Sequence, residues 1–307
     1  EAHGKLTGRP GVAFVTRGPG ATNASAGVHI ALQDSTPMVL FIGQVATDQR
    51  DREAFQEVDY RQMFSPLAKW VAEIDRTDRI PEYISHAFHV AMSGRPGPVV
   101  LALPEDILSA MADVADGAPA NPARQTVSQN AVSDVIDRLK AARNPMVIVG
   151  GGGWSSQAAQ DLERFASALG LPVGTSFRCQ DYIDNRHPNY VGDVGIAPNP
   201  ELATLVSKSD CILVLGARLG EMTSGGYEMF NIPTPCQKII HIHADPNEIG
   251  RVYRPEIGLA CQSGEFLSTA TDLIAEQSAD GPSASRAAYE RWQQPFQTPG
   301  AVKMEQV

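Results

Sequence analysis

Cysteine, excess positive charge and long apolar runs are scarce or missing in this sequence, and each absence excludes a class of protein. Only four of the 307 residues are cysteine, none in a Cys-x-x-Cys pair, which favours free thiols in a reducing compartment over a disulfide framework or a zinc site. The net charge of −10, from 25 basic and 35 acidic residues, argues against nucleic-acid binding, because phosphate neutralisation needs a basic excess. No apolar run reaches the length of a membrane span, and residues 1–5 do not resemble a signal peptide, so we expect a cytoplasmic protein without membrane contact.

Strand-like and helix-like segments alternate along most of the chain. With 307 residues, the chain is long enough for about two domains, each with its own core. Apolar runs at 12–16, 38–42 and 99–103 are continuous, which is typical of parallel strands covered on both faces. Helix-like segments at 21–33 and 80–93 accompany them, and the alternation resumes in the second half. The pattern predicts an α/β protein with two doubly wound domains and mainly parallel sheets.

Changes in composition divide the chain further. The stretch 111–128 is rich in Ala, Pro, Gly and Asp, and its prolines disfavour both helix and strand. We therefore predict a first domain at 1–110, a linker at 111–128 and a second domain at 129–280. The polar, proline-punctuated stretch 281–307 is expected to be a second linker, toward a further domain.

A glycine-rich turn follows the first predicted strand, in the segment Thr16-Arg-Gly-Pro-Gly-Ala-Thr-Asn23. Gly18 and Gly20 allow the backbone to approach a ligand without an intervening Cβ, and Pro19 stiffens the turn. Free amides at the start of the following helix favour an anionic or electron-rich partner. Taken alone, however, the pattern fits an ordinary strand-to-helix turn equally well.

Four motifs in this order and spacing resemble the pyrimidine-side domain of thiamine diphosphate enzymes, and in particular the acetolactate synthase group. The motifs are the turn just described, Asp34-Ser-Thr-Pro-Met38, Gly43-Gln-Val45 and Phe55-Gln-Glu57. The resemblance implies an enzyme that decarboxylates a 2-keto acid and joins the product to a carbonyl acceptor. It also implies thiamine diphosphate and Mg²⁺ as cofactors, and a homodimer or homotetramer, because such sites form between subunits.

The resemblance assigns roles to residues of the first domain. It implies that Gly18, Pro19, Gly20 and Asn23 lie against the aminopyrimidine ring, with Gln44 as a further cofactor contact.

A charged segment at 47–59 carries a second group of assignments. The resemblance implies that Phe55 forms an apolar wall of the active site, that Gln56 makes a polar contact there, and that Lys69 lies near the substrate entrance. A solvated charged loop and a plain surface lysine are the competing interpretations, because charged segments usually face water.

The second predicted domain contains candidate nucleotide-binding residues. Gly151 and Gly152 belong to a run of four glycines between a strand and a helix, and Thr175, Arg218 and Asp245 lie near the ends of further strands. The run is not Gly-x-Gly-x-x-Gly, so it does not indicate a standard NAD site. The resemblance leaves FAD, ADP and no ligand open, and the residues after Arg218 depart from flavin-binding acetolactate synthases. The alternative function is an FAD- or ADP-binding Rossmann-like module without thiamine chemistry.

The segment His241-Ile-His243-Ala-Asp245 places two imidazoles and a carboxylate on one face of a predicted strand. Three ligands along one strand span too far to hold one ion well, so we predict no metal site here.

Two parts of a complete thiamine site are missing from the sequence. The resemblance implies a glutamate that protonates the cofactor's pyrimidine ring, and its position falls before Glu1. It also implies a Gly-Asp-Gly…Asn motif that holds the diphosphate through Mg²⁺, whereas Gly192-Asp-Val194 fails at the third position. We therefore expect a fragment of a longer enzyme that lacks the Mg²⁺ site and is inactive alone.

Overall fold

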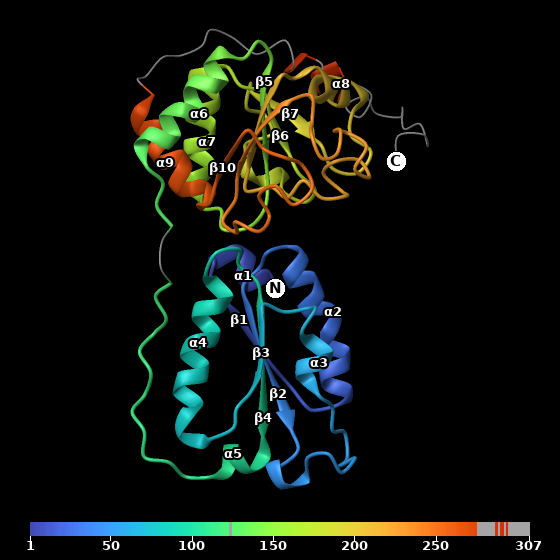
Figure 1. Cartoon of the computed structure of the whole chain (residues 1–307), viewed down its shortest axis with the longest axis vertical. Coiled ribbons are helices and arrows are strands. Elements are labelled where there is room, and N and C mark those ends of the chain that lie inside the picture. The colour runs from blue at the N-terminus through green and yellow to red at the C-terminus, as the bar shows by residue number, and fades with distance from the viewer. Residues whose placement is uncertain (123–124, 275–285, 288, 292, 294–307) are drawn as a thin grey trace. The chain divides into compact units, whose positions relative to one another are not determined.

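The computed structural model describes residues 1–122, 125–274, 286–287, 289–291 and 293 (Figure 1). The chain forms two compact units, residues 1–124 and residues 125–307, which are called the first and the second unit below. Among the described residues, no helix combines the length and the apolar character that crossing a bilayer requires.

The first unit contains a four-stranded parallel sheet with the strand order β1-β2-β4-β3. Its strands are β1 (Gly11–Val15), β2 (Met38–Gln44), β3 (Trp70–Glu73) and β4 (Pro98–Pro104). Its helices are α1 (Ala2–Thr7), α2 (Pro19–Gln33), α3 (Tyr60–Phe64), α4 (Ile80–Met92) and α5 (Glu105–Ser109). Two short 3₁₀ turns lie at Thr47–Gln49 and Thr77–Arg79.

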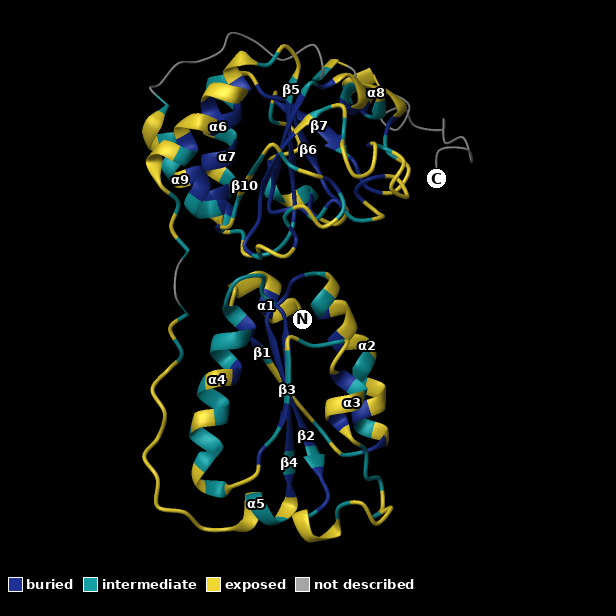
Figure 2. Cartoon of the chain, in the orientation of Figure 1, coloured by how far each residue is buried: buried dark blue, intermediate teal, exposed yellow. Residues whose placement is uncertain are grey.

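Alternation of buried side chains along β2 and β4 explains why helices cover both faces of this sheet. Leu40 and Ile42 pack on one face with α2 and α3, and Val39 and Phe41 pack on the other face with α4. Figure 2 shows the central strands buried and the outer faces of the helices exposed. The apolar run at 12–16 predicts a strand that is covered on both faces. The strand β1 instead lies at the edge of the sheet and exposes three consecutive residues.

Because the four strands are parallel, they all end at the same edge of the sheet. We call this edge the first carboxyl edge; it carries the connections that follow β1, β2, β3 and β4. The sequence places its glycine-rich turn directly after β1 and its charged segment directly after β2. Both therefore lie at this edge.

The second unit contains a six-stranded parallel sheet with the order β10-β9-β8-β5-β6-β7. Its strands are β5 (Pro145–Val149), β6 (Val173–Thr175), β7 (Tyr190–Asp193), β8 (Cys211–Leu215), β9 (Lys238–Ile242) and β10 (Ile257–Leu259). Its helices are α6 (Gln129–Ala141), α7 (Ser156–Leu169), α8 (Pro200–Lys208) and α9 (Ser263–Leu273), and Gln180–Tyr182 forms a 3₁₀ turn. The side chains of Ser128, Ser155 and Asn199 cap α6, α7 and α8.

The helices of the second unit also cover both faces of their sheet. The helices α6, α7 and α9 pack on one face around Val147 and Leu213 (Figure 1), whereas α8 packs on the other around Met146 and Ile212. The strand order reverses between β5 and β8, which is where open α/β sheets place ligands.

The predicted fold class, α/β with two doubly wound and mainly parallel sheets, is confirmed. Within the described residues from 110 to 128, the chain forms neither helix nor strand. Most of the predicted terminal linker, 281–307, lies outside the described residues.

Candidate functional site

The turn between β1 and α2 is built around Gly18, which precedes the helix with a φ of +53°. A Cβ at Gly18 would lie 2.8 Å from the Cβ of Gln56 and 3.1 Å from its carbonyl oxygen. A Cβ at Gly20 would lie 2.8 Å from Cγ2 of Thr16. Both glycines are therefore required by close contacts within this unit, and Gly18 also by its left-handed backbone.

The amides of this turn are engaged within the chain, which differs from the expectation that they face a ligand. The amide of Gly18 donates to the hydroxyl of Tyr60 at 2.8 Å, and the amide of Gly20 reaches the carbonyl of Arg17 at 3.4 Å. Tyr60 is 2% exposed, and this burial raises the pKa of its phenol. The hydrogen bond from Gly18 satisfies a tyrosine that would otherwise bury an unpaired hydroxyl.

The other side of the turn is open. Pro19 and Asn23 are exposed and Gly20 is half-buried, although Gly18 is buried beneath Gln56. Of the sequence-predicted set, Pro19, Gly20 and Asn23 thus contribute accessible surface on this side of the turn, whereas Gly18 lies beneath Gln56. This surface offers a rigid proline ring and a side-chain amide.

The structure brings Phe55 and Gln56 to this turn from 38 positions away in the sequence. Nε of Arg17 donates to the carbonyl of Phe55 at 3.1 Å, and the backbone of Gln56 packs on Gly18. The side chain of Phe55 is 78% exposed. Phe55 and Gln56 thus border the glycine turn, and their roles at a cofactor stay predictions.

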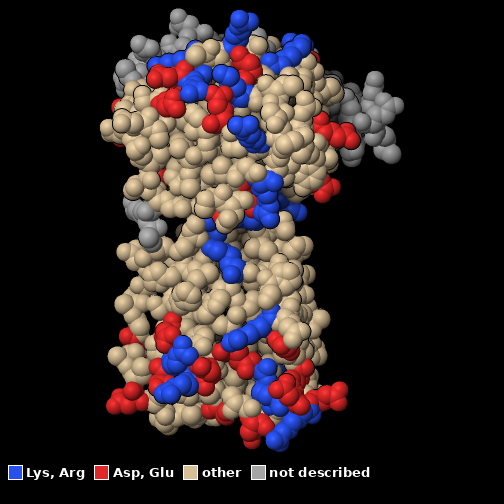
Figure 3. Space-filling model, in the orientation of Figure 1, with Lys and Arg blue, Asp and Glu red and all other residues tan. Residues whose placement is uncertain are grey.

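Glu57 organises the loop that presents this pair. Its carboxylate accepts hydrogen bonds from the amides of Asp51, at 2.9 Å, and Ala54, at 3.2 Å, and these bonds lower the pKa of Glu57. Arg50 contacts the Glu57 carboxylate at 3.3 Å and also pairs with Glu73 at the end of β3. Figure 3 shows side chains of both signs intermixed at this end of the first unit. The loop is thus held by charges of opposite sign.

Gln44 lies close to this loop but is fully buried at the end of β2. Its amide nitrogen donates to the carbonyl of Val58 at 2.9 Å, and its amide oxygen accepts from the backbone of Val45 at 3.0 Å. Gln44 therefore anchors the loop and offers no surface to a ligand within this unit.

Lys69 is not brought together with the other predicted residues of the first unit. It precedes β3 and consequently lies at the amino edge of the parallel sheet, opposite the first carboxyl edge. Its ammonium donates to the carbonyls of Val90 and Ser93 near the end of α4. This arrangement places positive charge at a helix C-terminus, where it is favourable.

In the second unit, the glycine run follows β5 and meets the loop that follows β8. A Cβ at Gly151, where φ is +76°, would lie 2.0 Å from the carbonyl oxygen of Gly216, and a Cβ at Gly150 would lie 2.0 Å from Oγ of Ser176. Trp154 donates to the carbonyl of Gly150 at 2.9 Å and stacks on Tyr182. Close packing between loops is sufficient to explain these glycines.

The remaining predicted residues of the second unit gather at the same edge of its sheet. Gly152 and Arg218 are half-buried, whereas Thr175 is fully buried at the end of β6. The half-buried Asp245 accepts hydrogen bonds from both the backbone and the side-chain amide of Asn247, at 2.9 and 3.0 Å. Only part of this set is therefore accessible to a ligand.

The two histidines of β9 and its following turn are held by backbone groups. His241 Nε2 lies 3.0 Å from the carbonyl of Ala217, and burial lowers the pKa of His241 to about 4. His243 Nδ1 accepts from the amide of Asp245 at 3.0 Å. Within the described part of the chain, no three His, Cys, Asp or Glu side chains converge as metal ligands.

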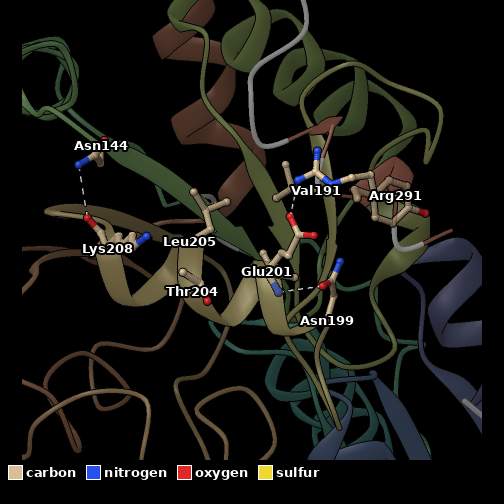
Figure 4. Close-up of a pocket in the computed structure, with 10 residues that line it drawn as sticks. Asn144, Val191, Asn199, Glu201, Thr204, Leu205, Lys208 and Arg291 are labelled. Carbon is tan, nitrogen blue, oxygen red and sulfur yellow. Dashed lines mark hydrogen bonds and ion pairs between the residues drawn. The ribbon is translucent and has the colours of Figure 1, made fainter. Parts of the chain in front are cut away.

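A pocket of about 380 Å³ lies along α8 of the second unit (Figure 4). Glu201 and Arg291 form an ion pair of 2.6 Å at its wall. Asn199 caps α8 through Oδ1, and its Nδ2 has no hydrogen-bond partner among the described residues. None of the sequence-predicted site residues lines this pocket.

The geometry adds three residues that sequence analysis gave no role: Arg17, Glu57 and Tyr60. Arg17 and Glu57 stand inside motifs that carry the resemblance, but their partners become visible only once the chain is folded. Tyr60 follows the charged segment, and its contact with Gly18 joins positions 42 apart.

Comparison with protein families gives two matches along this chain. The description "Thiamine pyrophosphate enzyme, N-terminal TPP binding domain" matches residues 1–63. The description "Thiamine pyrophosphate enzyme, central domain" matches residues 132–269. The two matches follow the chain in the order of its two units.

Curated relatives include large subunits of acetolactate synthase. The chain is 34% identical over 259 residues to a probable acetolactate synthase large subunit of Methanococcus aeolicus, covering 82% of this chain and 43% of the relative. It is 31% identical over 284 residues to the acetolactate synthase isozyme 3 large subunit of Escherichia coli, covering 91% and 49%. The chain thus spans about half the length of these relatives.

Proposed function

Because the chain belongs to the thiamine pyrophosphate enzymes and resembles acetolactate synthase large subunits, we propose that its first unit forms one wall of a thiamine diphosphate site. The complete enzyme decarboxylates a 2-keto acid and joins the product to a carbonyl acceptor. The observation that carries this proposal is the packing of Gln56 on Gly18, beside the exposed Pro19 and Asn23.

These residues fit a flat heterocycle for physical reasons. Gly18 turns the chain so tightly that Gln56 packs on it directly, and Pro19 presents a rigid apolar ring next to this contact. Asn23 and Gln56 add side-chain amides, each of which both donates and accepts hydrogen bonds. Such a surface combines stacking area with a few polar groups, as small-molecule sites generally do.

The chain's own residues position the cofactor in this proposal. Pro19 supports the aminopyrimidine ring, Asn23 and Gln56 orient it through hydrogen bonds, and Phe55 excludes water from one side. When bound, thiamine diphosphate supplies the carbanion stabilisation that decarboxylation and carboligation need. Gln44 acts indirectly, since its buried amide anchors the loop at Val58. Lys69 contributes at a substrate entrance only if another subunit brings that entrance to the amino edge.

Further parts of the site come from outside residues 1–307 in this proposal. They are the glutamate that protonates the pyrimidine ring and the motif that holds the diphosphate through Mg²⁺. The glutamate would precede Glu1 in the first unit itself, and the site would form at a subunit boundary of a homodimer or homotetramer. The chain alone is accordingly expected to be catalytically inactive.

The proposal is tested by substituting Gln56 in the protein encoded by the complete reading frame. Loss of one hydrogen bond to the cofactor costs about 1–3 kcal/mol, so Gln56→Ala should raise the Kd for thiamine diphosphate roughly 5- to 150-fold in calorimetric titration. Gln49→Ala is a matched control, because Gln49 is exposed in the same loop. An unchanged Kd in Gln56→Ala would contradict the proposal.

A nucleotide on the second unit is a second candidate, beside the thiamine site. Its support is that Gly152, Arg218 and Asp245 lie half-buried at one edge, next to the reversal of strand order. FAD or ADP would be the ligand. Absorption spectra and chromatography of the denatured protein would detect either nucleotide. If neither FAD nor ADP is found after purification and reconstitution, this second candidate is excluded. A module without thiamine chemistry is not favoured, because residues 1–63 match a TPP-binding domain.

A further inference from the structure

We propose that Arg17 is a positioning residue, which holds the Phe55–Gln56 segment against the glycine turn and so fixes the orientation of Gln56. The inference rests on the proposed function, because it concerns the approach of Gln56 to thiamine diphosphate. It assigns a role to a side chain that lies within the turn and contacts the loop after β2 and the first turn of α5.

One guanidinium joins three segments of the first carboxyl edge. Nε of Arg17 donates to the carbonyl of Phe55 at 3.1 Å, and Nη1 pairs with the carboxylate of Glu105 in the first turn of α5. The end of β1, the loop after β2 and the helix after β4 are thereby tied together. The planar guanidinium suits this task, because its donors point in fixed directions.

The loop needs such a restraint because its backbone is strained. Asp51, Glu53 and Gln56 have φ values of +61°, +54° and +66°, in the left-handed region that residues with a Cβ disfavour. Strained residues persist only where the surroundings over-determine them. Releasing the Phe55 carbonyl would therefore let the peptide before Gln56 rotate toward a relaxed conformation.

The neighbouring side-chain contacts hold other parts of the site, and not the peptide between Phe55 and Gln56. Glu57 binds the amides of Asp51 and Ala54 and so fixes the part of the loop before Phe55. Tyr60 holds the opposing side of the contact, at the amide of Gly18. Among the described residues, the side-chain hydrogen bond that the Phe55 carbonyl accepts comes from Arg17.

The first experiment measures amide hydrogen exchange in the 307-residue chain without cofactor. Arg17→Ala should speed exchange at residues 54–57 at least about tenfold, including the Glu57 amide that donates to Ala54. The strands β2 and β4 should be unaffected. Arg17→Lys should give an intermediate effect, because it keeps the charge opposite Glu105 but loses the fork. Arg52→Ala removes an exposed arginine from the same loop and should change nothing.

The second experiment is a double-mutant cycle for thiamine diphosphate affinity in the protein from the complete reading frame. If Arg17 acts through Gln56, Arg17→Ala should raise the Kd about tenfold or more, and Gln56→Ala should add little in the Arg17→Ala background. Unchanged loop exchange, or strictly additive effects on the Kd, would overturn the positioning role. A wild-type protein that does not bind thiamine diphosphate would instead overturn the proposed function, and the exchange result would still report on the Arg17 contact.

Discussion

At the scale of single residues, the contact between Gly18 and Gln56 joins two of the motifs in the candidate site. It requires a residue without Cβ at position 18, because φ is +53° there and a Cβ would lie 2.8 Å from the Cβ of Gln56. The sequence predicts the need for glycine at this turn. It does not identify the partner, because close approach between segments far apart in the sequence depends on how the sheet is ordered.

Gly18→Ala should therefore lower the free energy of unfolding of the first unit by about 2 kcal/mol or more, from backbone strain and overpacking together. Gly27→Ala is the matched control, since Gly27 lies within α2 with open space around it. The control should be neutral or stabilising by up to about 1 kcal/mol. Urea unfolding of both variants measures the difference, and equal effects would contradict the assigned contact.

His241 makes the stability of the second unit depend on pH. Burial lowers its pKa from 6.5 to about 4, so the unfolded state binds the extra proton first as the pH falls. The stabilisation that neutral His241 gives to the folded second unit is fully present above about pH 6.5. It is lost progressively as the pH falls to 4, which lowers the free energy of unfolding by about 3 kcal/mol in total. Glu248 and His243 are the charged and titratable neighbours that act on it.

Urea unfolding of the wild type and of His241→Gln at pH 7 and pH 4.5 measures this contribution. The wild type should lose more stability than the variant between the two pH values. Parallel pH profiles, or an NMR titration of His241 near the ordinary value for histidine, would contradict the buried and neutral state.

At the scale of elements, the central strands were predictable and the short edge strands were not. Continuous apolar runs mark β2, β4, β5 and β8 because both faces of these strands are buried. The strands β3, β7 and β10 have only three or four residues and at least one half-exposed position. Their sequences therefore carry too little hydrophobic periodicity to distinguish them from loops.

Substitution of a buried leucine should lower the free energy of unfolding more than substitution of an exposed leucine. Leu40 on β2 is 1% exposed, whereas Leu6 on α1 is 86% exposed. Leu40→Ala should cost about 2–5 kcal/mol, since it leaves a cavity between the sheet and α2. Leu6→Ala should cost less than about 0.5 kcal/mol, as exposed substitutions usually do. Calorimetry resolves the two variants, and similar losses would argue against the assigned core.

At the scale of the whole molecule, the two units each have a sheet with helices on both faces. The alternation of strands and helices predicted this organisation, and the order of the family matches follows it. The motifs of the candidate site could be recognised in the sequence, whereas the contacts that hold these motifs together could not. Arg17, Glu57 and Tyr60 act through contacts between distant segments, which local sequence patterns do not encode.

The most direct test of the central claim is a crystal structure of the protein from the complete reading frame, with thiamine diphosphate and Mg²⁺ bound. The aminopyrimidine ring should lie against Pro19 and Gly20, with the side chain of Gln56 in hydrogen-bond contact. A cofactor bound elsewhere, or a glycine turn covered by other protein segments, would contradict it.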